Sequence, residues 1–424
     1  MAVNERSGSL ALTPLLRDSM VSWEVLDDRY GPLLKLVDTV LGVVPNCDRY
    51  LEIWPPAFRT YNIMVPNFLN LPVPVFGVGG PPASVVGLAM YVASRTAECP
   101  YCSAHSCSFA LRRGATPDKV AAALVPDGGT FSPGELAAIA VARSLARIPC
   151  ELTAAERAEL VDAFGERHAE WIVLGAVMMG FLNKFMDAVG VELEQPVVAE
   201  VSETIGPEWS PGKAGALLDP AAPSRPAPPV DGLRTKRRLL PLLPAAIRTD
   251  RKWQRGVPGR WPDAGAFLRE RTGHDFPVLE RLHSNRVRRS ITSMLTTNLD
   301  PASSAVGIDT KVLAGAVFAE LVADGHLAED IRALARHAGI GADRLAKTTA
   351  FARGDDTALP ADNPSGAALI LARAASYSPA RVDSTTIAAC SESELPAAAI
   401  IEMITWLAVL QMLHRLTCFT SIAD

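Results

Sequence analysis

The sequence predicts an all-α protein, and three observations support this fold class. Aromatic residues make up only 6% of the 424 residues, whereas hydrophobic residues make up 49%. Among the hydrophobic residues, Ala, Leu and Val recur at helical spacing, which argues against an all-β sandwich. Charged residues account for 21%, close to the average for globular domains, so the chain is not largely disordered.

Helix-start and helix-stop signals divide the first half into a run of helices. Gly114 is placed as a C-terminal cap, and Thr116 with Pro117 opens the next helix as N-cap and first helical residue. Ser132 and Thr153 each precede a Glu by three residues, the capping-box pattern. The last helix, over 169–189, is apolar almost all round and should be buried. The predicted helices of this half begin near residues 82, 100, 117, 133, 154 and 169.

The second half resembles the first in sequence. Aligning Gly114 with Gly339 gives an offset of 339 − 114 = 225, and Pro149 matches Pro379 at 379 − 149 = 230. The stretch 181–185 matches 412–416 at 412 − 181 = 231, so the matches keep a common order and a nearly constant spacing. This pattern predicts an internal duplication. The helices expected in the second half cover 309–324, 327–338, 342–352, 366–376 and 396–419.

The segment between the halves changes in composition. Residues 195–262 contain several prolines between 220 and 229, a basic run at 234–238 and little apolar periodicity. We interpret this segment as a linker or a surface arm. The sequence therefore predicts a helical domain over 1–194, a Pro-rich linker or arm over 195–262 and a second, degenerate helical domain over 263–424. The length alone, at roughly 100–200 residues per domain, already favours two or three domains.

The charge and the apolar stretches exclude several classes of partner. The chain has 41 Lys and Arg against 46 Asp and Glu, a net charge of −5, so it lacks the basic footprint of a nucleic-acid-binding protein. Residues 1–20 lack the pattern of a secretory signal. The longest apolar stretches, 171–182 and 395–413, are interpreted as core helices, since the first is short and the second carries Glu402. We therefore expect a cytoplasmic protein with neither a membrane nor a nucleic acid as partner.

Three of the seven cysteines lie within nine residues, in the run Cys99-Pro100-Tyr101-Cys102 and then His105 and Cys107. A C-x-x-C pair in an intracellular protein serves either thiol redox chemistry or metal binding. On a helix, Cys102 lies about 60° from Cys99 and His105 about 60° further on, whereas Cys107 lies about 80° to the other side. Four ligands spread in this way cannot surround one tetrahedral zinc ion. We therefore expect neither a metal nor another cofactor.

Thiol redox chemistry fits the same residues better. Cysteines in the first turn of a helix face the positive end of the helix dipole and free N–H groups, which favour the thiolate. His105 lies one turn beyond Cys102 and can accept the thiol proton. Two sulfurs three residues apart can form a redox-active disulfide after one of them is oxidised. The alternative is that the cysteines are small buried hydrophobic residues and that His105 is an ordinary surface histidine.

The run from Cys99 to Gly114, together with the closing helix around 181–190, resembles the alkylhydroperoxidase D-like (carboxymuconolactone decarboxylase) family. Members of this family are all-α and oligomerise through their helices, so the resemblance implies a homo-oligomer. Its redox branch reduces hydroperoxides with the C-x-x-C pair, a peroxiredoxin-type antioxidant activity. The resemblance implies that Cys102 attacks the peroxide, that Cys99 is the resolving cysteine and that His105 relays the proton. A dithiol or a thioredoxin-like protein would be the reductant.

Two positions differ from the peroxidase branch of the family. The histidine of the family usually lies four residues after the second cysteine, whereas here Ser106 holds that place and His105 lies one residue earlier. That branch carries a Glu upstream of the first cysteine, but residues 84–89 contain no acid. At the offset of 225, Cys99 aligns with Asp324, Cys102 with Leu327 and His105 with Asp330, so we expect the second half to be non-catalytic. It would pack on the first half as an internal pseudo-dimer partner.

Three functions remain open at this point. The first is a hydroperoxide-reducing thiol oxidoreductase, with Cys102, Cys99 and His105 as catalytic residues. The second is a carboxymuconolactone decarboxylase-like enzyme that performs acid–base chemistry on a small carboxylate or lactone. The third is a non-catalytic assembly module with vestigial cysteines.

Overall fold

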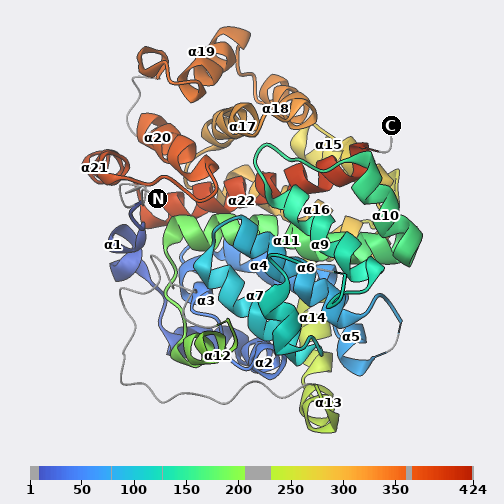
Figure 1. The fold of residues 1–424 in the computed structure, drawn as a ribbon. Coiled ribbons are helices and arrows are strands. Elements are labelled where there is room, and N and C mark those ends of the chain that lie inside the picture. The colour runs from blue at the N-terminus through green and yellow to red at the C-terminus, as the bar shows by residue number, and fades with distance from the viewer. Residues whose placement is uncertain (1–8, 78, 127, 206–230, 360–364, 423–424) are drawn as a thin grey trace, which may run out of the picture.

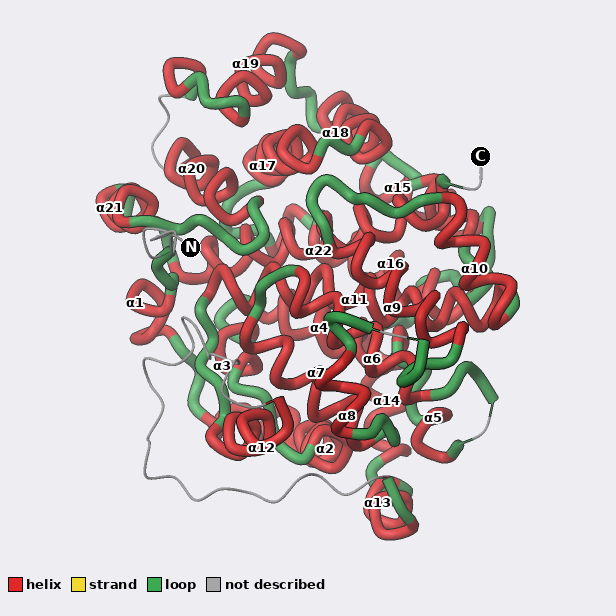
Figure 2. The backbone as a smooth tube through the Cα atoms, viewed as in Figure 1, coloured by secondary structure: helices red, strands yellow, loops and turns green. Residues whose placement is uncertain are grey.

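The computed structural model describes residues 9–77, 79–126, 128–205, 231–359 and 365–422. Within these ranges the regular elements are helices and no β-strand is present, which confirms the predicted all-α class (Figure 2). The prolines between 220 and 229 lie outside the described residues.

The helices of the first half begin where the capping signals place them. Ser132 and Thr153 each form a complete capping box with the Glu three residues later. The side chain of Thr116 accepts a hydrogen bond from the backbone of Lys119 and caps the helix that Pro117 opens. The helices up to the end of this half are α1 (Thr13–Leu16), α2 (Trp23–Leu41), α3 (Cys47–Leu51), α4 (Pro55–Phe68), α5 (Val73–Phe76), α6 (Ala83–Thr96), α7 (Pro100–Arg112), α8 (Pro117–Ala122), α9 (Pro133–Ala146), α10 (Ala154–Phe164) and α11 (Glu166–Val189).

The second half is also a run of helices that ends in a long apolar one. Glu98 and Ala323 precede α7 and α18 respectively, and each adopts the left-handed conformation with φ of 54°. The residue that follows each of them is an N-cap whose side chain accepts a hydrogen bond from the helix backbone. The internal duplication itself stays a prediction. The helices are α15 (Asp263–Thr272), α16 (Asn285–Asn298), α17 (Ile308–Val322), α18 (Gly325–His337), α19 (Ala342–Ala352), α20 (Ser365–Ser376), α21 (Ser384–Glu392) and α22 (Ala397–Ser421).

Helices α11 and α22 pack against each other through the centre of the molecule (Figure 1). Both are long and apolar enough to cross a membrane, but 94% and 89% of their most apolar windows are buried inside the protein. Gly180 of α11 lies against α22, where a Cβ atom would meet the Arg415 side chain and the Gln411 carbonyl oxygen, each at 3.0 Å. The two helices are therefore core helices, as the sequence predicts.

Part of the predicted linker is helical. Helix α12 (Gln195–Ile205) packs on α7 and α8 and buries Val197 and Val201. Helices α13 (Leu233–Leu239) and α14 (Leu243–Trp253) both contact α2, and Leu239 joins a small apolar cluster there. Prolines and a basic run obscure the apolar spacing of these short helices in the sequence.

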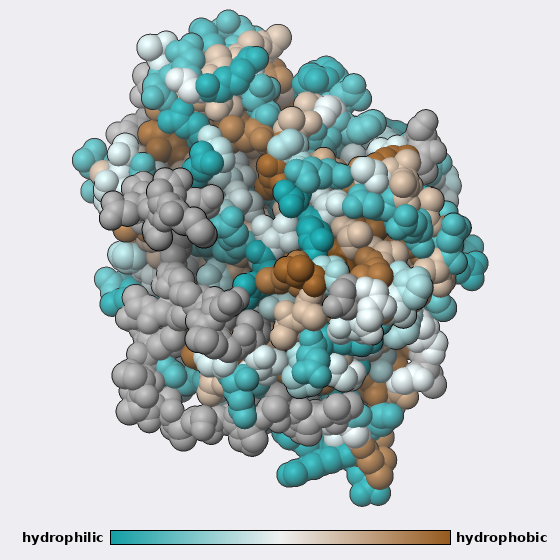
Figure 3. Space-filling view, in the orientation of Figure 1, coloured by the Kyte–Doolittle hydropathy of each residue, from teal (hydrophilic) through white to brown (hydrophobic). Residues whose placement is uncertain are grey.

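Hydrophilic residues cover much of the rim of the face shown in Figure 3, with smaller apolar areas toward its centre. The division into domains stays a prediction.

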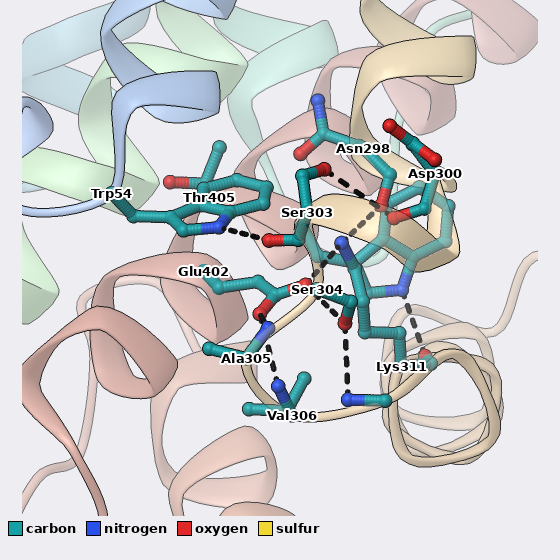
Figure 4. Close-up of polar contacts among 12 residues, drawn as sticks. Trp54, Asn298, Asp300, Ser303, Ser304, Ala305, Val306, Lys311, Glu402 and Thr405 are labelled. Carbon is teal, nitrogen blue, oxygen red and sulfur yellow. Dashed lines mark hydrogen bonds and ion pairs between the residues drawn. The ribbon is translucent and has the colours of Figure 1, made fainter.

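A fully buried ion pair joins α17 to α22 (Figure 4). The ammonium group of Lys311 lies 2.9 Å from Oε1 of Glu402, and neither side chain is exposed to solvent. The other carboxylate oxygen, Oε2, accepts hydrogen bonds from the backbone N–H groups of Ala305 at 2.5 Å and Val306 at 3.0 Å. The indole ring of Trp54 lies 4.9 Å from the Lys311 ammonium. The pair thereby fixes the loop before α17 against the central helix.

Replacing Glu402 with Gln should destabilise the fold by about 3–5 kcal/mol, because Lys311 would remain buried without its counter-charge. Chemical denaturation of the full chain measures this change. The matched control is Asp343→Asn, which breaks a pair with Lys347 whose side chains are 83% and 63% exposed. Exposed pairs contribute less than about 1 kcal/mol, so an equally small loss in Glu402→Gln would contradict the prediction.

Candidate functional site

The C-x-x-C motif lies at the N-terminus of α7. Cys99 is the N-cap, with an extended backbone, and its sulfur accepts a hydrogen bond from the backbone N–H of Cys102 at 3.4 Å. Pro100 is the first helical residue. Both thiols are free, and the two residues are only 1% and 2% exposed. The structure thus places two reduced sulfurs at the positive end of a helix dipole.

The surroundings of Cys102 favour the neutral thiol at rest. Burial raises the pKa of Cys102 well above its ordinary value, and the hydrogen bond with Cys99 raises it further. The charge of the fully buried Arg415, which α22 contributes, interacts with both thiols. Burial lowers the pKa of Arg415 to about 10, and the neighbouring thiolates oppose that effect. Activating Cys102 therefore requires a group that removes its proton.

His105 lies one turn further along α7 and is held by a carboxylate. Its Nε2 lies 2.7 Å from Oε2 of Glu194, and the hydroxyl of Tyr101 donates to Oε1 of the same carboxylate at 2.9 Å. The backbone N–H of Asn46 also donates to Oε1, at 2.5 Å. Burial acts to raise the pKa of Glu194, but the charge of His105 and these hydrogen bonds outweigh it and lower the pKa overall. Glu194 is therefore an ionised partner that orients the imidazole.

Sequence reasoning missed Glu194. The family resemblance predicts an acid before the first cysteine, but residues 84–89 contain none. Glu194 instead follows the buried helix α11, between its C-cap Gly190 and the start of α12. The only signal is a pair of acids, Glu192 and Glu194, directly after a long apolar helix.

A second group of polar residues lies behind this carboxylate. Cys47 is buried, and the hydroxyls of Tyr61 and Tyr101 hydrogen-bond to it. Burial raises the pKa of Cys47 well above its ordinary value, and the charges of Asp48 and Glu194 raise it further. Burial and the charge of Glu194 raise the pKa of Asp48 to about 8, against the opposing effect of Asn62. Asp48 is therefore mostly protonated at neutral pH. Sequence reasoning did not select these α3 residues, because nothing in the sequence links them to the motif.

A cavity of about 60 Å³ opens onto the site and has room for a few water molecules. Cys102, His105 and Ser106 line one side of it. The other walls are mainly apolar side chains from α2, α4, α6, α7 and α11 and from the loops beside them. They are Leu41, Pro45, Tyr61, Val65, Leu69, Met90, Tyr101, Phe109, Met178, Met179, Leu182 and Met186. The thiol that faces this space is that of Cys102, whereas Cys99 is not among the lining residues.

A larger apolar cavity of about 110 Å³ adjoins the first one, between α2, α4 and α14. The two cavities share four wall residues, Leu41, Tyr61, Val65 and Leu69. These four residues therefore lie between the cavity beside Cys102 and the larger apolar one.

Cys107 does not line the site cavity. Burial raises its pKa to about 12, and the charge of Glu200 adds to the rise. Across the part of the chain that the structure describes, no three His, Cys, Asp or Glu side chains converge in a way that would hold a metal ion.

The aligned positions of the second half hold carboxylates that pair with histidines. Asp324 caps α18 through the backbone N–H of Leu327 at 3.0 Å, as Cys99 caps α7. Its other oxygen lies 2.7 Å from Nδ1 of His414. Asp330 lies 2.7 Å from Nε2 of His274. The side chain that caps the helix is therefore a thiol at α7 and a carboxylate at α18.

Comparison with known proteins identifies no family for this chain. No family model matches it, and no curated protein sequence matches it. Two solved structures of the debrominase Bmp8 are partly similar, the free enzyme at 22% identity and a variant in complex with 2,3,4-tribromopyrrole at 20%. Each match covers 44% of this chain, with a TM-score of 0.38. The match covers 96% of the free debrominase chain and 95% of the variant chain. A likeness at these values carries no inference about activity.

The raised pKa of Asp48 predicts a pH-dependent stability. An unfolded aspartate loses its proton near pH 3.8, whereas Asp48 in the fold loses it near pH 8. Unfolding between these values releases a proton, so stability should fall as the pH rises from about 4 to 8. Asp48→Asn should remove this slope and raise the free energy of unfolding at pH 7 by about 4 kcal/mol.

Urea denaturation of wild type and Asp48→Asn across pH 4 to 8 measures the slope. Asp343→Asn, which removes an exposed carboxylate, is the control and should leave the slope unchanged. Parallel stability curves for wild type and Asp48→Asn would contradict the assignment.

Proposed function

We propose that this protein is a thiol-dependent oxidoreductase of the alkylhydroperoxidase D-like type that reduces a hydroperoxide. One observation carries the proposal: Cys102 and His105 line the same cavity, and Glu194 holds the imidazole. This is the arrangement of a nucleophile, a base and a group that orients the base. Glu194 supplies the acid that the stretch before Cys99 lacks.

The proposed reaction begins with transfer of the Cys102 proton to His105, directly or through a water in the cavity. The thiolate then attacks one oxygen of the hydroperoxide and the O–O bond breaks. Cys102 becomes a sulfenic acid, and the alcohol leaves with the proton that His105 returns. The Cys99 thiol attacks the sulfenic sulfur, water is released and a disulfide forms. A dithiol or thioredoxin-like reductant restores both thiols.

The walls of the two cavities favour a substrate with an apolar body. Polar side-chain atoms reach the first cavity from Cys102, His105, Ser106, Tyr61 and Tyr101. Three of the four residues that the two cavities share are aliphatic, namely Leu41, Val65 and Leu69. An organic hydroperoxide can place its peroxide group at Cys102 and its apolar group beyond Leu41 and Val65. Hydrogen peroxide would use only the first cavity.

The setting of the cysteines supports a reducing, cytoplasmic location as part of the proposal. All seven cysteines are free, and disulfides are rare in that compartment. Assembly into a homo-oligomer belongs to the same proposal through the family resemblance.

A second candidate is an acid–base enzyme that acts on a small carboxylate or lactone. The ionised Glu194 and its contact with His105 favour it, because such a pair can move a proton without any thiol. This candidate predicts activity that depends on His105 and not on the cysteines.

Cys102→Ser should lower the rate of organic hydroperoxide consumption at least a hundredfold, since it removes the nucleophile. Cys99→Ser should oxidise Cys102 once and then stop with a sulfenic acid there, because no resolving thiol remains. Peroxide assays, with trapping of the sulfenic acid and mass analysis, measure both results.

Cys390→Ser is the matched control, since Cys390 is buried in α21 and lines neither cavity. It should retain the wild-type rate. If Cys102→Ser keeps the rate, the thiol mechanism is wrong. The second candidate would then be favoured if His105→Gln loses the turnover of a carboxylate or lactone and the cysteine variants keep it.

Val65→Trp should separate substrates by size, because Val65 lies in the wall that the two cavities share. We expect kcat/KM for cumene hydroperoxide to fall at least tenfold while that for hydrogen peroxide changes less than about twofold. Val125→Trp, at a residue that is 85% exposed, is the control and should change neither value. An equal loss for both peroxides would contradict the proposed substrate path.

A further inference from the structure

A second pair of thiols lies between the two halves of the chain. Cys150 is in the loop after α9, and Cys418 is in the last turn of α22. The two side chains hydrogen-bond to each other, and each residue is neither fully buried nor fully exposed. Neither cysteine lines the two cavities of the proposed active site. This pair therefore lies outside the machinery described above.

An imidazole and a carboxylate stand beside this pair. The sulfur of Cys418 lies 3.8 Å from Nδ1 and 3.9 Å from Nε2 of His414, one turn earlier on α22. The carboxylate of Asp324 lies 2.7 Å from Nδ1 of the same histidine. Asp324 therefore fixes the ring and leaves Nε2 free to accept a proton from the thiol.

The contact between the two thiols shifts their pKa values in opposite directions. The hydrogen bond from Cys418 lowers the pKa of Cys150, burial opposes this, and the backbone of Leu152 and the charge of Arg415 add to the lowering. The same contact raises the pKa of Cys418 far above its ordinary value. His414 lies beside the sulfur of Cys418, so it can accept the Cys418 proton when this thiol attacks a sulfenic acid on Cys150.

The corresponding place in the other half holds no thiols. At offsets of 380 − 150 = 230 and 418 − 187 = 231, the counterparts of Cys150 and Cys418 are Ala380 and Asp187. There, the backbone N–H of Ala380 donates to the Asp187 carboxylate at 2.6 Å. At each of these places, a loop of one half contacts the central helix of the other half. The contact is a hydrogen bond between Ala380 and Asp187 at one place and the Cys150–Cys418 thiol pair at the other.

We propose that Cys150 and Cys418 are a second redox-active dithiol, which a hydroperoxide converts into a disulfide between the loop after α9 and α22. The Cys150 thiolate attacks the peroxide, the O–O bond breaks, and the alcohol leaves with a proton from the solvent. The Cys418 thiol then attacks the sulfenic sulfur of Cys150. Its proton passes through His414 to the departing hydroxide, which leaves as water while the S–S bond forms.

Oxidation of this pair has a consequence for the first one. Arg415 follows His414 on α22, and its charge interacts with Cys150 and Cys418 as well as with Cys99 and Cys102. A disulfide between Cys150 and Cys418 leaves Cys99 and Cys102 as the thiols that interact with the Arg415 charge.

Disulfide mapping tests this inference independently of the proposed peroxidase activity. The full chain with Cys99→Ser and Cys102→Ser, and the wild type, are reduced, treated with cumene hydroperoxide, alkylated and digested. We expect a linked Cys150–Cys418 peptide in both proteins, with Cys390 alkylated throughout as the internal control. Recovery of Cys150 and Cys418 as separate alkylated peptides in the wild type overturns the inference, whatever the first pair does.

Single variants test the assigned roles. Cys418→Ser should accumulate a sulfenic acid at Cys150 that dimedone traps, whereas Cys150→Ser should leave Cys418 as a thiol. His414→Gln should slow disulfide formation at least tenfold and flatten its dependence on pH. Equal trapping at Cys418 in Cys150→Ser would show that the roles are reversed and would overturn the assignment. The wild-type mapping decides the main point if a variant does not fold.

Discussion

Helix α11 packs closely against α22 where Gly180 meets Arg415. This contact places the Arg415 charge near both thiol pairs, Cys99–Cys102 and Cys150–Cys418. A side chain at Gly180 would push the Arg415 stem and the neighbouring α22 backbone away. Close packing at this point lets α11 carry Met178, Met179 and Leu182 into the wall of the Cys102 cavity. It also buries the Arg415 charge within reach of four sulfurs. A buried cation is costly without a partner, and here the carbonyl of Ala176 accepts a hydrogen bond from it at 2.8 Å.

The electrostatics of the first site follow from burial. A thiol that is 2% exposed holds its proton more tightly than a thiol in water, so the helix dipole alone does not make Cys102 reactive. Glu194 stays ionised in the same surroundings because His105, Tyr101 and a backbone N–H group satisfy it. An ionised carboxylate stabilises a protonated imidazole. In the proposed mechanism, Glu194 would therefore stabilise the imidazole after the Cys102 proton has moved to His105.

Features that depend on near neighbours could be predicted from the sequence, and those that depend on distant ones could not. The capping boxes at Ser132 and Thr153 and the helix that begins at Pro100 are set by residues within one turn, and the structure has them as expected. Glu194 lies 89 positions from His105, and no local pattern relates the two. The same holds for Cys150 and Cys418, which meet only because the two halves pack together. The helices inside the predicted linker were missed because their apolar residues are interrupted by prolines and basic side chains.

The two halves solve one backbone problem with different chemistry. Each needs an acceptor for the free N–H group at the start of a helix that follows a left-handed residue. A sulfur fills this place at Cys99 and can also be oxidised, whereas a carboxylate fills it at Asp324, makes a stronger hydrogen bond and is inert to peroxide. The carboxylate then serves a new purpose, since it fixes the imidazole of His414 beside Cys418. On the proposed second dithiol, the thiol of this half lies instead at the far end of α22, in Cys418.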